Sequence, residues 1–533
     1  MGSKAPGPSD RVAVDDATNM IYIANQVDNA AFAIDRNHAR RPQTDPGQPA
    51  SIDHARLAKV HRSKDRSTIM CRLRITTAKL AACLGACALV TTFGAGQARA
   101  AGASRPAFAL IDLGTLGGPQ SAVSNFPVPF SAPDGAFVGT ADTPASDPYG
   151  ANQNPSLSGD PFVQHTFVRR DGKITDLGAL GAQPATNSSW PASVNARGDL
   201  AGVSDTGKTD PLVGYAQAHA ALWKHGRITD LGTLGGNESV AFWLNNRDQV
   251  VGAAANTISD PVSAFGYGTQ TRAFLWEHGT MRDLGTLGGP DAAAFFVNNA
   301  GQAAGTSYTD SIVQPATGTP TNHPFLWEDG RMHDLGTLGG TSAGVSDLND
   351  RGQVVGQSNL NGDSAFHPFL WTGRSLSDLG TLGGDLGGAN WINVRGQVVG
   401  WADTPVHLTP PLGEPGDQLY QAFLWDNGTM TNLGTAPGDK CSVANSINNR
   451  GQVVGNAGKC HGAIDAFLSE NGKTVNLNSL IAPSPLHLKE ALSIDDRGEI
   501  MGIGVLPNGN RHQYVLIPRP ESDRINVAQS ATP

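Results

Sequence analysis

Short runs of alternating apolar and polar residues recur along most of the chain, separated by turns rich in glycine and asparagine. One stretch shows the pattern well, with runs at 239–245, 249–254, 272–276 and 281–286. Such alternation is typical of β-strands with one buried face. An Asn-x-x-Gly type of turn joins the first two runs, and Glu277-His278-Gly279 joins the last two; Asn and Gly both tolerate the positive φ that tight hairpin turns need. Each stretch therefore predicts a sheet of four antiparallel strands.

The same stretch is repeated about eight times. The sequence DLGTLGG begins at Asp112, Asp230, Asp283, Asp334 and Asp378, DLGALGA begins at Asp176, and altered copies begin at Asn432 and Asn476. Two further motifs recur in phase with it, one of the type INNRGQVVG and one of the type HAFLW. A repeat of about 40–50 residues with four strands is the size of a propeller blade and does not fit a helical solenoid.

These three motifs resemble those of the HAF-repeat family of probable extracellular proteins. The resemblance covers about residues 106–518, with departures in the first copy, which has SAPDGAFVG, and in the two copies that begin with Asn. It implies secretion and a repeated architecture, and it provides no catalytic residues to carry over.

The two ends of the repeated region complement each other. Residues 108–113 have the pattern of a fourth strand with no sheet before it, and residues 512–517 that of a third strand with no fourth strand after it. Pairing them would remove two exposed sheet edges. We therefore predict an all-β fold, a closed β-propeller of eight four-stranded blades in which the N-terminal strand completes the last blade. An open β-solenoid is the alternative.

The charge distribution argues against nucleic-acid binding. Residues 1–100 hold 14 Lys and Arg against 8 Asp and Glu, whereas residues 101–533 hold 24 against 39. An acidic body without a basic stripe is a poor partner for phosphate backbones.

Residues 70–100 read as a secretory signal peptide. A short basic region follows Met70, an apolar stretch runs over 80–93, and an A-x-A motif predicts cleavage between Ala100 and Ala101. An uncleaved anchor is the alternative. Residues 11–35 resemble one repeat of the YVTN β-propeller family, but a single repeat cannot bury its own faces. We therefore interpret 1–69 as a disordered or mis-assigned upstream segment, 101–520 as the mature propeller and 521–533 as a disordered tail.

Cys441 and Cys460 are the two cysteines beyond residue 100. They flank the predicted hairpin at 442–456, which places them opposite each other on antiparallel strands. Two cysteines in an exported chain indicate a disulfide, since zinc sites use about four ligands. The predicted location is extracellular or periplasmic, without stable membrane insertion after processing.

Candidate binding residues lie where the repeats differ. The link from the second to the third strand is long in units one, two, three, four and six and short in the others. Insertions on one rim of a repeat protein often mark its binding face. The residues expected to contact a ligand there are Tyr149, Tyr215, Tyr267, Tyr420, Asp142, Asp205 and Asp403.

The repeated Trp, His and Asp residues are interpreted as structural, because a residue needed in every unit serves packing between units. No nucleophile elbow, HExxH, P-loop or CxxC motif is present. The sequence favours a secreted, non-enzymatic, monomeric module that binds an extracellular glycan or protein, without a cofactor. The alternative is a propeller carbohydrate-active enzyme with a carboxylate pair on the loop-rich rim; acidic links that hold calcium also stay open.

Overall fold

The computed structural model describes residues 107–121, 135–149, 161–408, 418–460 and 464–520, together with the backbone of three N-terminal strands. These strands are β1 (Arg11–Asp15), β2 (Met20–Asn25) and β3 (Ala30–Asp35), and they form one antiparallel sheet in the order β1-β2-β3. The predicted signal peptide, its cleavage site at Ala100 and Ala101, and the tail at 521–533 lie outside the described residues.

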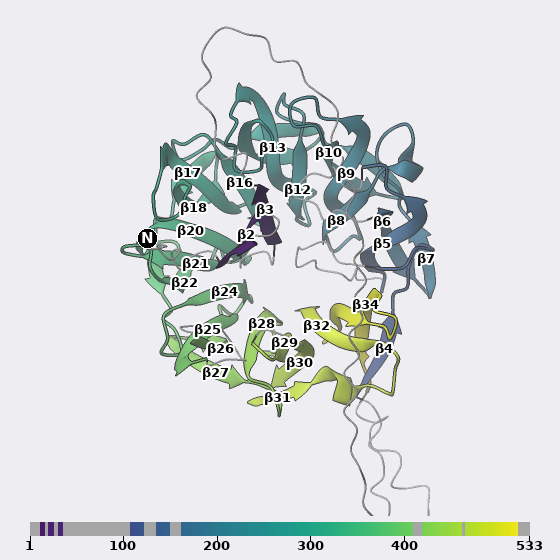
Figure 1. The fold of residues 1–533 in the computed structure, drawn as a ribbon, viewed down its shortest axis with the longest axis vertical. Helices are drawn as coiled ribbons and strands as arrows, with labels where there is room; N and C mark the ends of the chain where they lie inside the picture. The colour runs from purple at the N-terminus through teal and green to yellow at the C-terminus, as the bar shows by residue number, and fades with distance from the viewer. Residues whose placement is uncertain are drawn as a thin grey trace, which may run out of the picture. The chain divides into compact units, whose positions relative to one another are not determined.

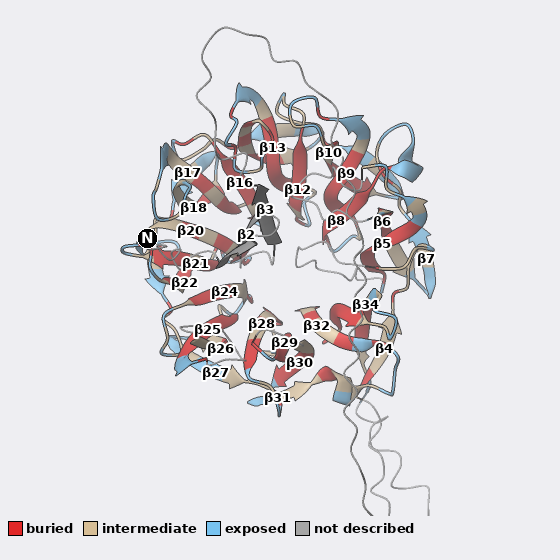
Figure 2. Cartoon of the chain, in the orientation of Figure 1, coloured by how far each residue is buried: buried red, intermediate tan, exposed pale blue. Residues whose placement is uncertain are grey.

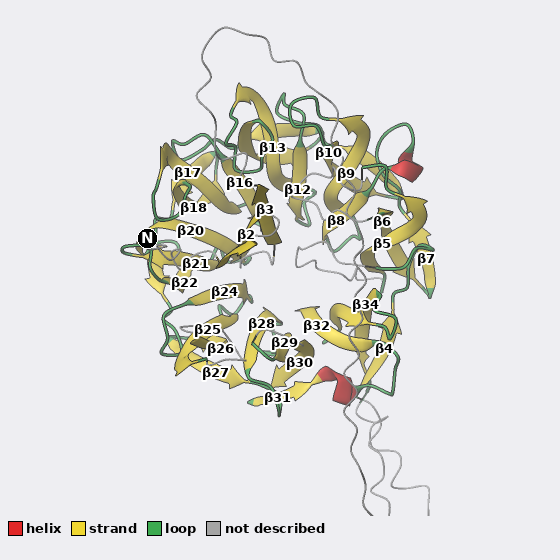
Figure 3. Cartoon of the chain, viewed as in Figure 1, coloured by secondary structure: helices red, strands yellow, loops and turns green. Residues whose placement is uncertain are grey.

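The rest of the described chain consists of antiparallel sheets that follow one another along the sequence (Figures 1 and 3). The strands of the first four sheets are β5 (Phe137–Ser146), β6 (Phe162–Arg170) and β7 (Lys173–Asp176); β8 (Ser189–Val194), β9 (Leu200–Thr209), β10 (Ala216–Lys224) and β11 (Arg227–Asp230); β12 (Ser239–Leu244), β13 (Val250–Ser259), β14 (Thr269–Glu277) and β15 (Thr280–Asp283); and β16 (Ala292–Val297), β17 (Ala303–Val313), β18 (Pro320–Glu328) and β19 (Arg331–Asp334).

The strands of the remaining sheets are β20 (Gly339–Leu348), β21 (Val354–Leu360), β22 (Phe366–Trp371) and β23 (Leu376–Asp378); β24 (Gly387–Ile392), β25 (Val398–His407), β26 (Gln418–Asp426) and β27 (Thr429–Gly434); β28 (Cys441–Ile447), β29 (Val453–Gly458), β30 (Ile464–Glu470) and β31 (Lys473–Asn476); and β32 (His487–Ile494), β33 (Ile500–Val505), β34 (Arg511–Pro518) and β4 (Phe108–Asp112). We number these sheets 1 to 8 in this order. Two short 3-10 helices, η1 (Pro184–Thr186) and η2 (Leu477–Leu480), lie in links between sheets.

Each complete sheet has the strand order expected of an up-and-down unit, for example β12-β13-β14-β15. A parallel pairing of Asn322 with Ser342 also joins sheets 4 and 5. In sheet 8 the order is β32-β33-β34-β4, so a strand from the start of the described body is the fourth strand of the last sheet. Its register runs from Phe108 opposite Pro518 to Asp112 opposite Tyr514.

Apolar clusters join each sheet to the next, and buried residues lie along the strands of the sheets (Figure 2). The aromatic residue of the HAF-type motif is at the centre of most of them and is fully buried, as Phe274, Phe325, Phe369, Phe423 and Phe467 show. Sheets 1 and 8 pack in the same way, because one cluster combines Phe137 and Phe167 with Met501 and Val515. Apolar packing therefore also connects the last sheet with the first.

The repeated His and Asp residues pair with each other within a sheet. The histidine on the third strand meets, through Nδ1, the aspartate at the end of the fourth strand, for example His323 and Asp334 at 2.9 Å. The same aspartate accepts the N–H of the glycine two residues later, here Gly336. Equivalent pairs are His165–Asp176, His219–Asp230, His367–Asp378 and His512–Asp112.

The sheets in which the His or the Asp of this pair is replaced keep the contact with other side chains. Sheet 3 has Arg272 with Asp283, and in sheet 6 Asn432 donates to Gln421. In sheet 7 Asn476 donates to Asp465. The change from Asp to Asn in the repeat is therefore matched by a change of its partner, which explains the two copies that begin with Asn.

Candidate functional site

The long second-to-third links form two-stranded arms that extend beyond the sheets. In sheet 3 the pairing of β13 with β14 slips after Ala255 and Thr271 and resumes at Ser259 and Thr269. The same slip extends the hairpins of sheets 1, 2, 4 and 6, whereas those of sheets 5, 7 and 8 end without it. The alternation of residues predicted the second strand of sheet 3 to end at residue 254, and the arm adds the residues up to Ser259.

Asp142, Asp205 and Asp403 lie at the start of an arm, where the pairing slips, and all three are buried. Asp142 accepts the N–H of Gln120 and the side-chain amide of Gln164. Asp205 and Asp403 are each joined through their backbone N–H to the link that enters their own sheet. These aspartates therefore hold the base of each arm.

The four candidate tyrosines differ in burial and in contacts. Tyr267 is 2% exposed and packs against Phe265, so it has no surface to offer a ligand. Tyr215, Tyr149 and Tyr420 are partly exposed. The Tyr215 hydroxyl donates to the carbonyl of Gly266 in the next unit.

Tyr420 joins sheets 6 and 7 in the same manner. Its hydroxyl donates to the carbonyl of Cys460, and its ring meets Trp401 edge to face. Cys460 forms a disulfide with Cys441, with the Cα atoms 4.9 Å apart. The disulfide predicted from the sequence is confirmed, and it lies beside a contact between links.

The exposed apolar residues of the arms were missed by the sequence analysis. Seven large aliphatic side chains are well exposed among the described residues, and six of them lie on arms. Those six are Leu212, Ile258, Val262, Ile312, Val313 and Val406, which are 54–80% exposed. The signal in the sequence was a β-branched or Leu residue in each long link, which does not by itself reveal exposure.

Buried carboxyl groups lie beneath the arms of sheets 2 and 3. Glu238 is 1% exposed and accepts the N–H of Ala218 at 2.9 Å. No N–H or O–H group donates to its Oε1. The side chain lies within hydrogen-bonding reach of Asp210, so the two carboxyl groups can share a proton. Burial, followed by the negative charges of Asp210 and Asp205, raises the pKa of Glu238 to about 9. Glu238 is therefore protonated at neutral pH.

Asp291 occupies the corresponding position under the arm of sheet 3. It accepts the N–H groups of Ala264 and Thr271 at 2.6 and 2.7 Å. Burial raises the pKa of Asp291 to about 6, although these two hydrogen bonds oppose the shift.

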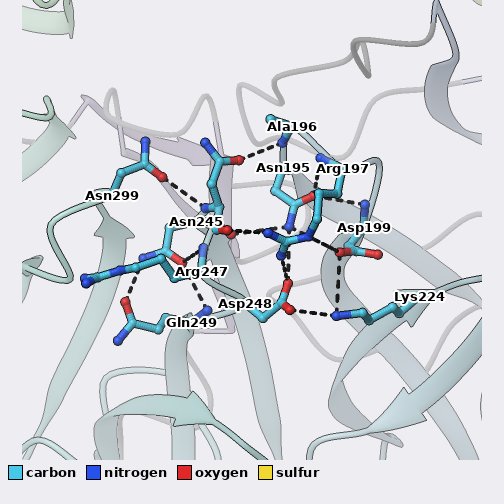
Figure 4. A network of polar contacts seen from close by, with 11 residues as sticks. Asn195, Ala196, Arg197, Asp199, Lys224, Asn245, Arg247, Asp248, Gln249 and Asn299 are labelled. Atoms are coloured by element: carbon cyan, nitrogen blue, oxygen red, sulfur yellow. Dashed lines mark hydrogen bonds and ion pairs between the residues drawn. The ribbon is translucent and has the colours of Figure 1, made fainter.

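The first strands of sheets 2 to 8, here called the inner strands, carry a belt of asparagines at the ends opposite to the arms. Each Asn of the Asn-x-x-Gly type of turn donates its side-chain amide to the carbonyl of the equivalent residue in the next sheet, as in Asn245 to Asn298 at 2.9 Å. The series continues from Asn195 in sheet 2 to the carbonyl of Asp495 in sheet 8. Each Asn side-chain oxygen also accepts two N–H groups of its own turn, from Arg247 and Gln249 in sheet 3 (Figure 4).

In these turns the Asn does not use the positive φ that it could tolerate. The left-handed residue is the one at the Gly position, with φ of 81° at Gly198 and 63° at Asp248, which stands in for glycine in sheet 3. The Asn instead keeps a negative φ, because its side chain completes the turn and makes the contact with the next sheet. In Figure 4, Arg197 reaches from one turn to Asp248 of the next and Lys224 meets the same carboxylate.

The belt surrounds a cavity of about 410 Å³. Its lining comes from the turn ends of sheets 2 to 8 and includes the side chains Trp243, Trp391 and Asp347. The two indole rings contact each other with their centroids 6.3 Å apart. Asp347 accepts the N–H of Leu348 and of Ile392, and burial raises its pKa to about 7.

Two further findings concern ions and membranes. No group of three or more His, Cys, Asp or Glu side chains suited to a metal ion occurs among the residues that the structure describes. Within the same residues, no helix has the length and apolar character needed to cross a bilayer.

No family model matches the chain, and no curated protein matches it in sequence. Solved structures do match in shape. The β-propeller domain of the Trilobed protease from Pyrococcus furiosus has a TM-score of 0.37 and 9% identity, over 68% of this chain and 100% of that one. A puromycin-hydrolyzing peptidase from Mycobacterium tuberculosis has a TM-score of 0.37 and 14% identity, over 76% of this chain and 62% of that one. A gluconolactonase from Xanthomonas campestris has a TM-score of 0.24 and 11% identity, over 51% and 90%.

The described body is thus an all-β assembly of antiparallel sheets whose structural neighbours include β-propellers. At such TM-scores and identities these similarities carry no argument about activity.

Proposed function

We propose that the chain is an exported, closed β-propeller of eight blades that binds an extracellular protein and has no enzymatic activity. The apolar packing between sheets 8 and 1 and the pairing of β4 with β34 support closure. The Cys441–Cys460 disulfide fits an oxidising compartment, since such bonds are rare in the reducing cytosol. The three motifs in phase fit a HAF-type repeat protein.

The observation that carries the binding proposal is the concentration of exposed aliphatic residues on the arms, which hold six of the seven among the described residues. Leu212, Ile258, Val262, Ile312 and Val406 come from four separate units and extend from the same ends of their sheets. Exposed apolar residues that gather on one side of a protein mark interaction sites. Branched aliphatic side chains suit a protein surface, because glycans are bound mainly through flat aromatic rings and polar groups.

The arms are also held in place, which favours binding. Buried Tyr267, the Tyr215 hydroxyl bond and the buried carboxyl groups of Glu238 and Asp291 fix the arms of sheets 2 and 3. A surface that is ordered before binding loses less conformational entropy when the partner arrives.

The hydrolase alternative has one observation in its favour, the pair of carboxyl groups formed by Glu238 and Asp210. Carboxyl groups in environments that set their pKa values apart can act as acid and base. However, Glu238 is 1% exposed and Asp210 is fully buried, so neither reaches a substrate. Their hydrogen bonds hold backbone groups of the arms instead. We therefore prefer the binding function.

The test places a photo-crosslinking amino acid at Val262 in the arm of sheet 3. The matched control places it at His278, in the turn at the other end of β14, because both positions are loop residues of one sheet. We expect discrete protein adducts with the exported-protein fraction of the producing cell from position 262 alone, lost when Leu212, Ile258 and Ile312 are replaced by Ser. Equal labelling from both positions, or no adduct from position 262, would refute docking through the arms.

A glycan array on the same protein separates the remaining outcomes. Glycan binding that is lost in the serine variant would move the proposal from a protein to a glycan ligand.

A further inference from the structure

The cavity at the asparagine belt lies at the opposite ends of the inner strands from the arms, so it is a site distinct from the docking surface proposed above. It opens to solvent, because Ala196, Asn246, Asn299, Val394 and Asp496 line it and are exposed. Its volume, about 410 Å³, is in the range of about 300–1,000 Å³ found for small-molecule sites.

The inner strands differ from sheet to sheet at one position, which lines this cavity in sheets 3, 5 and 6. The residue two places before the belt asparagine is Ser193, Trp243, Phe296, Asp347, Trp391, Ser446 and Ser493 in sheets 2 to 8. The belt residue that follows is Asn in six of these sheets and Asp in the seventh. Packing between sheets therefore fixes the belt but leaves this position free to vary, and serine suffices for the fold in three of the sheets.

Trp243 and Trp391 pack against the clusters that join their own sheets to the next, and they also contact each other. They belong to sheets 3 and 6, which are not neighbours, and yet their rings touch at 6.3 Å between centroids. Phe296 extends the aromatic group, with its ring 5.2 Å from that of Trp243. Both indoles are partly exposed and line the cavity. Two tilted rings in contact make a continuous apolar floor and leave no gap between them for a cation.

The rest of the lining combines aliphatic residues, such as Val194, Leu348 and Val394, with polar residues, and it contains no Arg, Lys or His. Asp350, Asp495 and Asp496 add carboxylates, and the turns add peptide and amide groups. Such a lining repels anions and offers many hydrogen-bond acceptors. An aromatic surface with acceptors around it is complementary to a pyranose ring, which has an apolar C–H face and a rim of hydroxyl donors.

We propose that this cavity binds an uncharged saccharide that stacks on Trp243 and Trp391. Asp347 is a positioning residue: its carboxylate accepts the N–H of Ile392, the residue after Trp391, and so holds sheet 6 against sheet 5 beside the floor. The site needs neither the arms nor a protein partner, so it stands if the docking proposal fails.

The experiment measures binding of glucose, galactose, mannose, N-acetylglucosamine and their β-linked disaccharides to the full chain by calorimetry and saturation-transfer NMR. We expect at least one of them to bind. Trp391→Ser should weaken that binding at least tenfold, and Trp391→Phe several-fold. Ser446→Ala is the matched control, because it alters the equivalent position in a sheet whose residue at that position does not line the cavity.

The serine variant copies the residue that three other sheets carry, so the fold should tolerate it, and its melting temperature checks this. The phenylalanine variant provides the same readout if the serine variant unfolds. The proposal is wrong if none of the probes binds, if binding survives Trp391→Ser in folded protein, or if glucuronate binds more tightly than glucose.

Discussion

At the scale of single residues, burial separates the tyrosines that the sequence groups together. Tyr267 is enclosed between Phe265 and its neighbours, whereas Tyr149 is partly exposed at the start of its link. Both occur in long links of the same type, so the sequence could not distinguish them.

Replacing Tyr267 with Ala should lower the free energy of unfolding by about 3 kcal/mol, because it leaves a cavity under the arm of sheet 3. Tyr149→Ala is the control and should change it by less than about 0.5 kcal/mol. Chemical denaturation of both variants measures the difference. Equal losses would show that Tyr267 is not the packing residue described here.

Glu238 gives the protein a pH-dependent stability. Its pKa is about 9 in the folded protein against an ordinary value of 4.5, so the folded chain keeps a proton that the unfolded chain releases between these values. The free energy of unfolding should therefore fall as the pH rises from about 5 to 8, by up to about 1.4 kcal/mol per pH unit for one proton. The raised pKa values of Asp291 and Asp347 act in the same direction.

Glu238→Gln tests this origin, because glutamine keeps an acceptor for Ala218 and a donor for Asp210. Denaturation curves at several pH values should show a slope smaller by about one proton in the variant. An unchanged slope would assign the pH dependence to other groups.

At the scale of elements, the pair at the ends of the third and fourth strands acts as one interchangeable unit. His with Asp in sheet 4 and Gln with Asn in sheet 6 make the same contact. Burial would raise the pKa of Asp334, but the hydrogen bonds from His323 and from the Gly336 N–H outweigh it and hold that pKa below its ordinary value.

His323→Gln and Asp334→Asn should each destabilise sheet 4 by less than about 1 kcal/mol, because both side chains are partly exposed. The double variant reproduces the pair of sheet 6 and should recover most of the loss. A double-mutant cycle from thermal melts measures the coupling. Additive losses would mean that the two residues act independently.

The Cys441–Cys460 disulfide closes the first hairpin of sheet 7, with a separation of 19 residues. Replacing both cysteines with Ser should lower the free energy of unfolding by about 3 kcal/mol in the entropic description of cross-links. The comparison is with the oxidised parent in denaturant, and reduction of the parent should produce the same shift. A variant as stable as the oxidised parent would contradict a stabilising bond.

At the scale of the whole molecule, one strand connects the two ends of the body. β4 supplies the fourth strand of sheet 8, and Phe108 lies in the cluster that joins sheets 7 and 8. Leu113, which follows β4, lies in the cluster that joins sheets 8 and 1.

Deleting residues 101–114 should therefore lower the melting temperature and cause self-association, because β34 becomes an unpaired edge. Thermal melts and size-exclusion chromatography of the shortened chain measure both effects. A shortened protein that is monomeric and melts like the parent would contradict closure through β4.

The sequence by itself determined the strands, the repeat, the partner of β4 and the disulfide. The reason is that alternation, turn residues and motif spacing are local properties that each sheet repeats. An element that is altered in one copy can therefore be recognised from the other copies. It also indicated which links are long, and the structure shows arms at those links.

Only the tertiary structure decided what those residues do. Tyr267 and Ile258 are large, largely apolar residues of one link, but Tyr267 is buried and Ile258 is exposed. Their burial depends on contacts with neighbouring sheets. Trp243 and Trp391 are 148 positions apart in the sequence, and only the packing of the sheets brings their rings together. A repeat determines what is the same in every sheet, whereas a site arises where different sheets contribute different residues to one place.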